Sequence, residues 1–283
     1  MTYIWQTVQS TIPYIEKYFL AIAVFVVAEQ LFPAERNQSI RNQFFNARYT
    51  VFFYLISPFI VLYPNILLTK FTAVTGNTQL INLDQWRAIG MGIFSWPIKY
   101  LALPFIPMFV YDFFYYWHHR LQHELPLLWE QHKLHHTDET LSCVTNLRHH
   151  WLEDGIRVFT ISIPMMHIVD FPGVSGPLVA LIIAQWSVFI HANIRIPLGP
   201  LTPVFAGPQL HRIHHSREPR HVNHNYAAFF PLWDILFGTY YRPLRGEWPA
   251  TGLGDGETVH SIGKASILPF KGWARMLTRK RPE

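Results

Sequence analysis

The sequence is poor in charge and in cysteine, and both shortages limit what the protein can be. Only 14% of its 283 residues are charged, against about a quarter in an ordinary soluble domain. Much of the protein surface is therefore expected to face membrane lipid rather than water. The one cysteine, Cys143, excludes a disulfide framework within the chain and a cysteine-ligated iron–sulfur cluster.

Several motifs are also missing. The first residues show no basic segment followed by a small-residue cleavage site, so no removable signal peptide is predicted. There is no His-Pro-Gly-Gly haem segment and no Gly-x-Gly-x-x-Gly fingerprint. If the protein catalyses a redox reaction, its electrons are therefore expected to come from a separate donor. The net charge of +5 comes from basic residues scattered between apolar runs or gathered in 271–283. This pattern favours an anionic membrane surface and gives no indication of nucleic acid as a partner.

Long apolar runs are what the sequence does have. They lie near residues 12–33, 49–69, 88–117, 156–171 and 174–191. The second run, "YTVFFYLISPFIVLYPNILLT", has 21 residues without a charge, which is enough to cross a bilayer core. The last run is also uncharged, whereas the first and fourth would equally suit buried helices of a soluble protein. These runs predict an all-α fold, an integral membrane helical bundle that crosses the lipid bilayer several times.

The basic residues predict how this bundle is oriented. The segments 34–48 and 118–155 each carry three basic residues, and the positive-inside tendency places both on the cytoplasmic side. The loop 70–87 then lies outside, and the last two runs form a hairpin over 156–191. The chain would therefore present a histidine-rich helical cap to the cytoplasm.

Histidine is the most informative residue. Sixteen occur, and all but His260 lie between positions 118 and 224. The stretches "HHRLQH", "HKLHH" and "HRIHH" place imidazoles three or four residues apart, hence on one helix face. Converging imidazoles would repel one another when protonated, or leave buried nitrogens unpaired, unless a cation lies among them. The predicted metal ligands are His119, His123, His132, His135, His136, His211, His214 and His215. Zinc takes at most four protein ligands, so eight imply two metals, and the spacing leaves iron and zinc both open.

The combination of "DFFYYWHHRLQHE", "HKLHH", "HRIHH" and "NYAAFFPLWDILFGTY" resembles the fatty acid hydroxylase / sterol desaturase superfamily of integral membrane di-iron enzymes. The resemblance covers about residues 105–242. It implies that the histidines hold two iron ions, which use O2 and two electrons to hydroxylate or desaturate a C–H bond of a membrane lipid or sterol. It also implies His191 and His150 as further ligands. The expected organisation is N-terminal spans in 1–104, a catalytic domain in 105–242 and a C-terminal tail in 243–283.

Two carboxylates are predicted to support the ligands. Asp112 precedes His119 by seven residues on the same helix face and is expected to accept the N–H of a ligating imidazole. Asp234, in the closing motif, is expected to act in a similar indirect way.

The residues alone leave other classes open, namely a haem-binding membrane protein, a metal-transporting membrane protein and a membrane zinc hydrolase. Histidine triplets at the ends of apolar runs, rather than single histidines inside them, favour the oxidoreductase.

Overall fold

The computed structural model describes residues 2–76, 80–81, 105–169 and 175–278. Within these ranges every regular element is a helix, joined by loops and a few isolated bridges, so the all-α prediction is confirmed. The apolar run predicted at 88–117 lies outside the described residues up to position 104. The main helices are α1 (Thr2–Leu31), α2 (Ile40–Thr75), α5 (Phe105–Glu124), α6 (Pro126–His136), α7 (Glu153–Arg157), α8 (Ile163–Ile168), α9 (Ser175–His191), α10 (Pro208–His214), α11 (Leu232–Leu236) and α12 (Ile262–Thr278).

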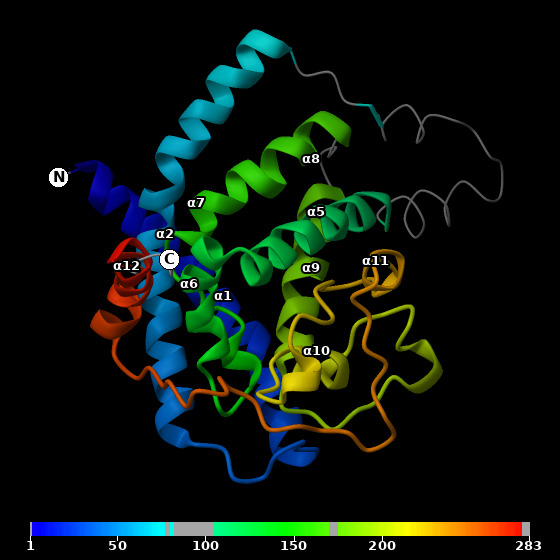
Figure 1. The fold of residues 1–283 in the computed structure, drawn as a ribbon. Helices are drawn as coiled ribbons and strands as arrows, with labels where there is room; N and C mark the ends of the chain where they lie inside the picture. The colour runs from blue at the N-terminus through cyan, green and yellow to red at the C-terminus, as the bar shows by residue number, and fades with distance from the viewer. Residues whose placement is uncertain (1, 77–79, 82–104, 170–174, 279–283) are drawn as a thin grey trace.

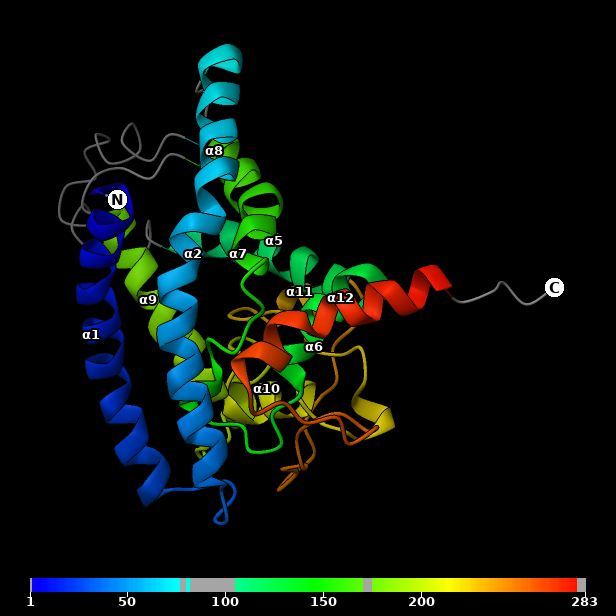
Figure 2. The same ribbon diagram turned by 90° about the vertical axis from the view of Figure 1, so that its left-hand side faces the viewer.

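Three long helices form one layer, and a lower region built around α6 and α10 lies beside one end of this layer (Figures 1 and 2). Helices α1, α2 and α9 run side by side, and α2 extends beyond the others (Figures 1 and 2). A π-helical turn, Val158–Ser162, links α7 to α8. The lower part contains α6 and α10, but most of residues 192–261 is loop with short helical turns. The predicted helical cap is therefore helical at α6 and α10 and irregular elsewhere.

Helix α2 changes character along its length. It begins after Ser39, whose Oγ accepts the backbone N–H of Asn42 at 3.3 Å, as an N-cap does. Its first part is packed into the protein and buries Phe45 and Tyr49, whereas Val74 near its other end is 86% exposed. Among the described residues, α2 is the one helix long and apolar enough to cross a membrane. Helix α9 is apolar but shorter, so the further spans stay predictions.

A buried arginine connects the region around α6 to helix α2 by hydrogen bonds. Arg148 is 1% exposed and donates to the carbonyl oxygen of Leu134, Oγ1 of Thr137, Oδ1 of Asn46 and the carbonyl oxygen of Val259. These bonds join the end of α6 to α2 and to the C-terminal segment. Arg148 is one of the three basic residues that the orientation prediction counts in 118–155, but its charge is buried and stabilises the interior.

Candidate metal centre

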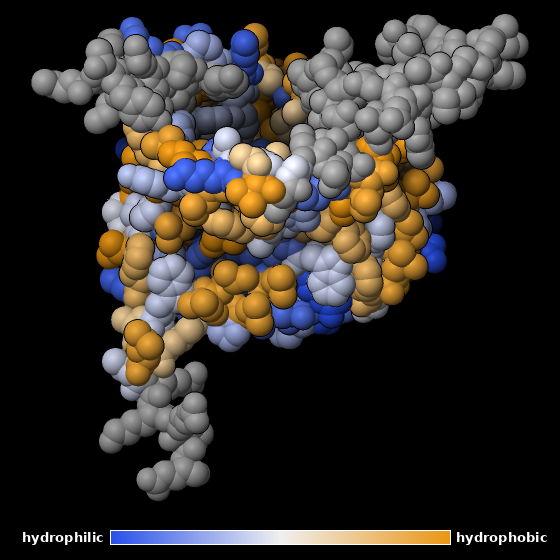
Figure 3. Space-filling view, turned by 90° about the horizontal axis from the view of Figure 1, so that it is seen from above, coloured by the Kyte–Doolittle hydropathy of each residue, from blue (hydrophilic) through white to orange (hydrophobic). Residues whose placement is uncertain are grey.

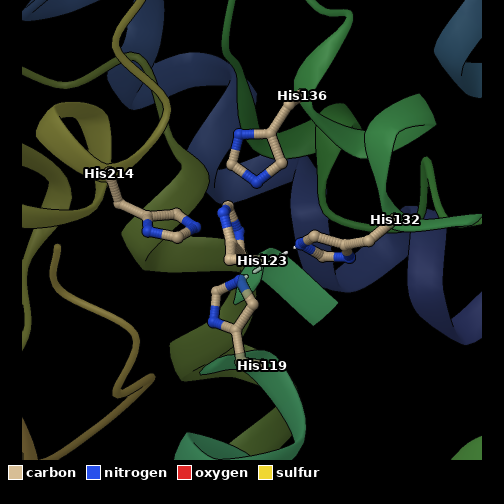
Figure 4. A group of neighbouring side chains, drawn as sticks. All are labelled: His119, His123, His132, His136 and His214. Atoms are coloured by element: carbon tan, nitrogen blue, oxygen red, sulfur yellow. Dashed lines mark hydrogen bonds between the residues drawn. The ribbon is translucent and has the colours of Figure 1, made fainter. Parts of the chain in front are cut away.

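A first group of imidazoles comes from three helices. Their ring nitrogens lie within 4.8 Å of one another, and Figure 4 shows the rings pointing toward a common centre. Helix α5 supplies two members one turn apart, α6 supplies two more, and α10 supplies the fifth. The members are His119, His123, His132, His136 and His214.

A second group lies directly beside the first. It contains His135, His191, His211 and His215, again with ring nitrogens within 4.8 Å of one another. The rings of His136 and His215, one from each group, stack with their centroids 4.3 Å apart. The helical spacing explains this division, because His135 and His136 are neighbours in sequence and point about 100° apart around α6.

Backbone carbonyl groups fix the protonation of several rings. Nδ1 of His119 lies 2.7 Å from the carbonyl oxygen of Tyr226, and Nδ1 of His191 lies 2.6 Å from that of Ser187. His214 makes the same contact, at 2.9 Å, with a carbonyl oxygen of the loop after α10. Because a carbonyl oxygen only accepts, each Nδ1 carries the proton and each Nε2 presents a lone pair.

These lone pairs converge at short distances. Nε2 of His191 lies 2.9 Å from Nε2 of His211 and 3.0 Å from Nε2 of His135. In the first group, Nε2 of His119 lies 3.1 Å from Nε2 of His132. One proton can satisfy one such pair, whereas a cation attracts all the lone pairs at once. The donor set therefore fits a metal ion in each group.

Unpaired nitrogens support the same conclusion. Nε2 of His123, His136 and His214 are buried and have no hydrogen-bond partner among the described residues. Buried polar atoms without partners are costly, and here three of them belong to one group. A metal ion bound by this group would give each nitrogen a partner.

Burial keeps the rings neutral, which metal binding requires. It lowers the pKa of His132 to about 4 and that of His214 to about 3. The pKa values of His135, His211 and His215 are lowered as well, first by burial and then by neighbouring imidazoles. At neutral pH these nitrogens are available as ligands without losing a proton.

A buried carboxylate that sequence reasoning missed lies beside the first group. Glu153, the first residue of α7, has an Oε2 atom 3.0 Å from Nδ1 of His149 and 3.5 Å from Nδ1 of His132. Its Oε1 accepts from Arg157 at 2.6 Å. Burial raises the pKa of Glu153, but His149 and Arg157 outweigh that effect and hold it well below its usual range.

His149 extends the influence of this carboxylate to the second group. Its ring stacks on that of His135 with centroids 4.2 Å apart. The sequence carries a signal for this pair, because His149 and Glu153 are four residues apart in "RHHWLE", but the family resemblance points to the neighbouring His150.

His150 lies away from both groups. Its Nε2 atom is 3.0 Å from the carbonyl oxygen of Ser266 in α12, and its ring contacts Phe270 of that helix. The structure thus brings together every predicted ligand except His150. The adjacent His149 turns toward the metal centre, and His150 holds the C-terminal helix.

Asp112 and Asp234 have different partners from those predicted. Asp112 accepts three backbone N–H bonds, from residues 228–230, at 3.0, 3.0 and 2.7 Å. It stands two helical turns, about 10 Å, from His119, too far for a short carboxylate to reach that ring. Asp234 accepts the N–H groups of Tyr226 and Ala227 at 2.8 and 2.9 Å. Both carboxylates therefore shape the loop whose Tyr226 carbonyl orients His119, and the expected bond from Asp112 to an imidazole is absent.

Two cavities approach the metal centre from different sides. One of about 550 Å³ lies between α1, α2, α5 and α9 and is lined mainly by apolar and aromatic side chains, among them Tyr18, Tyr54, Tyr115, Ile183 and His149. The other, of about 300 Å³, reaches His123, His136 and His214 beside the loops 216–223 and 252–254. The two share no lining residue.

Comparison with known proteins finds relatives that modify lipids. The chain is 30% identical over 191 residues to the ornithine lipid hydroxylase OlsE of Rhizobium tropici, covering 67% of this chain and 56% of the relative. It is 29% identical over 182 residues to human alkylglycerol monooxygenase, covering 63% of this chain and 36% of the relative. It is 25% identical over 158 residues to the very-long-chain aldehyde decarbonylase GL1-6 of rice (Oryza sativa subsp. japonica), covering 48% and 24%.

The chain spans 56% or less of the length of these curated relatives. No solved structure matches it significantly. The family model for fatty acid hydroxylase matches residues 105–239, the region that supplies every imidazole of the two groups. Residues 105–239 therefore form a domain of the fatty acid hydroxylase family.

Proposed function

We propose that the protein is a membrane-bound non-haem oxidoreductase that uses two iron ions and O2 to hydroxylate a C–H bond of a membrane-dissolved lipid or sterol. One observation carries this proposal: two adjoining buried groups of imidazoles, suited to metal, lie near an apolar cavity that is lined by His149. The relatives support it, because two of them are named for adding oxygen to lipids.

The size of the first group supports iron as the metal. Five ring nitrogens lie within 4.8 Å of one another, which is more than the four protein ligands of a zinc site. Iron accepts imidazole and higher coordination numbers. Iron bound by the two groups would supply the activation of O2, and the chain's own residues would control position, protonation and access.

The carbonyl oxygens of Tyr226 and Ser187 keep the proton of their imidazole partners on Nδ1 and leave Nε2 free to bind. Oε2 of Glu153 lies 3.5 Å from Nδ1 of His132 and 3.0 Å from Nδ1 of His149, and its negative charge favours a proton on those nitrogens and makes the rings stronger donors. This part of the centre is preorganised, because its rings are held by contacts that need no metal.

The 550 Å³ cavity supports a lipid as substrate. Its volume falls in the range of small-molecule sites, and its lining is mainly apolar. His149 lines the cavity and stacks on His135, so a chain in the cavity would end beside the second group. The apolar wall would exclude water and hold one C–H bond near the metals, which is the orientation that such chemistry needs.

The chain offers no electron carrier of its own among its sequence motifs, so we propose a separate donor. The 300 Å³ cavity gives such a donor an approach to the first group that avoids the lipid cavity. Addition of one oxygen atom to a C–H bond consumes O2, two electrons and two protons and releases one water. The donor must therefore supply two electrons for each turnover.

We further propose a multi-pass protein with the metal centre on the cytoplasmic side. Arg36, Arg41 and Arg48 are exposed near the start of α2, on the side of the histidines, which supports this orientation. A reporter fused after residue 283 tests it, because α12 packs directly on the histidine-bearing α6. An external signal from the reporter would contradict the orientation.

Lipid mass spectrometry under 18O2 tests the activity. Membranes of cells that express the chain are compared with those of cells that express His135→Ala. A lipid that gains one labelled oxygen only with the unaltered protein is the expected result. A lipid that loses two hydrogens without label would instead indicate desaturation. A change confined to water-soluble metabolites would contradict a membrane-dissolved substrate.

A further inference from the structure

The C-terminal helix α12 has a feature that the catalytic proposal does not use. At about 100° per residue, one sector of the helix packs inward and contains Ala265, Leu268, Pro269 and Gly272. A second sector is apolar yet exposed. It includes Ile267, Phe270 and Leu277, of which the last is 89% exposed. A helix buried on one side in a soluble protein would be polar on the other, so this second sector needs a partner.

Basic side chains form the third sector. Lys264, Lys271 and Arg275 are all exposed and fall within roughly 40° of one another around the helix. They lie beside the exposed apolar sector, on the edge away from the aromatic residues. An exposed apolar face flanked by basic residues is the pattern of helices that lie in the plane of a membrane surface.

The position of α12 agrees with this pattern. It runs across the direction of α2, near the middle of that helix (Figures 1 and 2). Ala265 and Leu268 belong to a buried cluster with Phe45 and Tyr49 of α2, at the level where α2 is still packed into the protein. Beyond residue 53, α2 continues for 22 residues, about 33 Å, close to the thickness of a bilayer core. Helix α12 therefore lies next to the depth at which α2 would enter the lipid.

Aromatic side chains lie at the same depth. Phe270 contacts Trp151, just before α7, and Trp273, with ring centroids 6.2 and 5.2 Å apart. Tryptophan is enriched where membrane and water meet. Figure 3 shows hydrophobic side chains among paler ones on the arm that leads into the grey C-terminal residues.

The inner face of α12 connects it to the metal centre. Nε1 of Trp273 donates to the carbonyl oxygen of Leu127 in α6 at 2.8 Å, and Gly272 packs so closely on the side chain of Glu130 of α6 that a β-carbon would force this side chain to shift. Helix α6 carries three of the clustered histidines. The depth of α12 would therefore set the depth of the metal centre below the lipid.

We propose that α12 is an interfacial anchor: its exposed apolar sector lies in the headgroup–acyl boundary of the bilayer, and its basic sector binds anionic lipid headgroups. The partner is the anionic membrane surface, because the charge of the sector is positive and the exposed apolar sector belongs to a helix that packs directly on α2, the long apolar helix. Because α12 packs on α6, the anchor would hold the histidines of α6 at a fixed distance from the lipid bilayer that supplies the substrate.

The test places a fluorophore on the helix in the full-length protein. Leu277→Cys and the control Leu244→Cys, an exposed apolar residue on a loop (59% exposed), are labelled with an environment-sensitive dye. The native Cys143 is buried and should not react with the dye. Labelling of the unaltered protein measures any background reaction at this residue. Each protein is reconstituted into phosphatidylcholine vesicles, with and without phosphatidylglycerol, and is quenched by lipid-borne nitroxide or by aqueous iodide.

The label at 277 should emit at shorter wavelength than that at 244, respond to the lipid nitroxide and resist iodide, more strongly when phosphatidylglycerol is present. Lys264→Glu with Lys271→Glu should remove the phosphatidylglycerol dependence, whereas Arg245→Glu on the loop should leave it unchanged.

Equal access of iodide to both labels would overturn the anchor. A label shielded from both quenchers, with disulfide-linked dimers of the unlabelled variant, would assign the face to a second copy and overturn it too. An unchanged response without anionic lipid would overturn the headgroup contact. None of these readouts depends on catalysis, so they stand apart from the proposed activity.

Discussion

Replacing Glu153 with glutamine tests how the centre holds its ligands. The carboxylate is completely buried, and its pKa is held well below its usual range by His149 and Arg157 in spite of burial. It is therefore ionised at neutral pH, and the substitution removes a full negative charge while keeping the shape. Gln131, which donates to Oε2 at 3.1 Å, can still donate to the new amide oxygen.

The expected loss can be estimated from the contacts. Oε2 lies 3.0 Å from His149 and 3.5 Å from His132, and losing such a partner weakens metal binding by roughly 10–100-fold, or about 1.4–2.7 kcal/mol. Arg157 also loses its 2.6 Å partner but keeps Asp154 at 3.6 Å. The cost to folding should therefore be about 1.5–3 kcal/mol, as for a lost hydrogen bond to a charged group.

Competition with a metal chelator, read by elemental analysis of the purified protein, measures the affinity, and thermal unfolding of the metal-free protein measures the stability. Asp154→Asn is the matched control, since it changes a carboxylate one residue away that contacts Arg157 but no histidine. An affinity in Glu153→Gln equal to that of the unaltered protein, or an equal loss in the control, would refute the role given to Glu153.

Four further predictions follow from the same geometry. His135→Ala and His214→Ala should each lower metal content and abolish lipid oxidation, whereas His150→Ala should keep the metal and lower only thermal stability; metal analysis distinguishes them. Asp112→Asn should lower the free energy of unfolding by about 1.5–3 kcal/mol with a smaller effect on metal affinity than Glu153→Gln; the reverse ranking would contradict its loop-holding role. Ile183→Trp should fill the 550 Å³ cavity, raising KM or lowering turnover with metal content unchanged. The metal-free protein should lose stability as pH falls from about 6.5 to about 4, because the unfolded chain binds protons at imidazoles whose pKa values are lowered in the fold; a flat melting temperature over this range would contradict it.

Much of the candidate centre could be predicted from local spacing. His119 and His123 share a face of α5, and the triplets that end at His136 and His215 fall on or at the end of α6 and α10. Spacing of three or four residues has a direct helical meaning, so these imidazoles needed no tertiary information. His191 was added through the family resemblance, and its ring lies in the second group.

The partners of these imidazoles could not be predicted in the same way. His119, His191 and His214 donate to backbone carbonyl groups, and every residue has one, so the sequence carries no signal for them. Asp112 was assigned to an imidazole because it shares a helix face with His119. The three backbone N–H groups that it binds come from a loop more than a hundred residues away.

The apolar runs predicted where the helices lie in the sequence, but not whether lipid or protein packs against them. The run 49–69 is part of the longer helix α2, whose first half packs one face against the protein and buries Phe45, Tyr49 and Phe53. Hydropathy averages over a window and does not distinguish lipid from a protein neighbour. The segment 243–283 was expected to be a tail, yet it contains α12, whose inward sector is short and becomes evident only when α6 packs against it.

The number of iron atoms bound per chain tests the central claim most directly. The full-length protein, purified from cells supplied with iron and freed of loosely bound metal, is measured by elemental analysis against protein concentration. The two groups of imidazoles predict two irons per chain, falling toward one when His191, which belongs only to the second group, is replaced by alanine. One metal in the unaltered protein, or zinc in place of iron, would contradict the account.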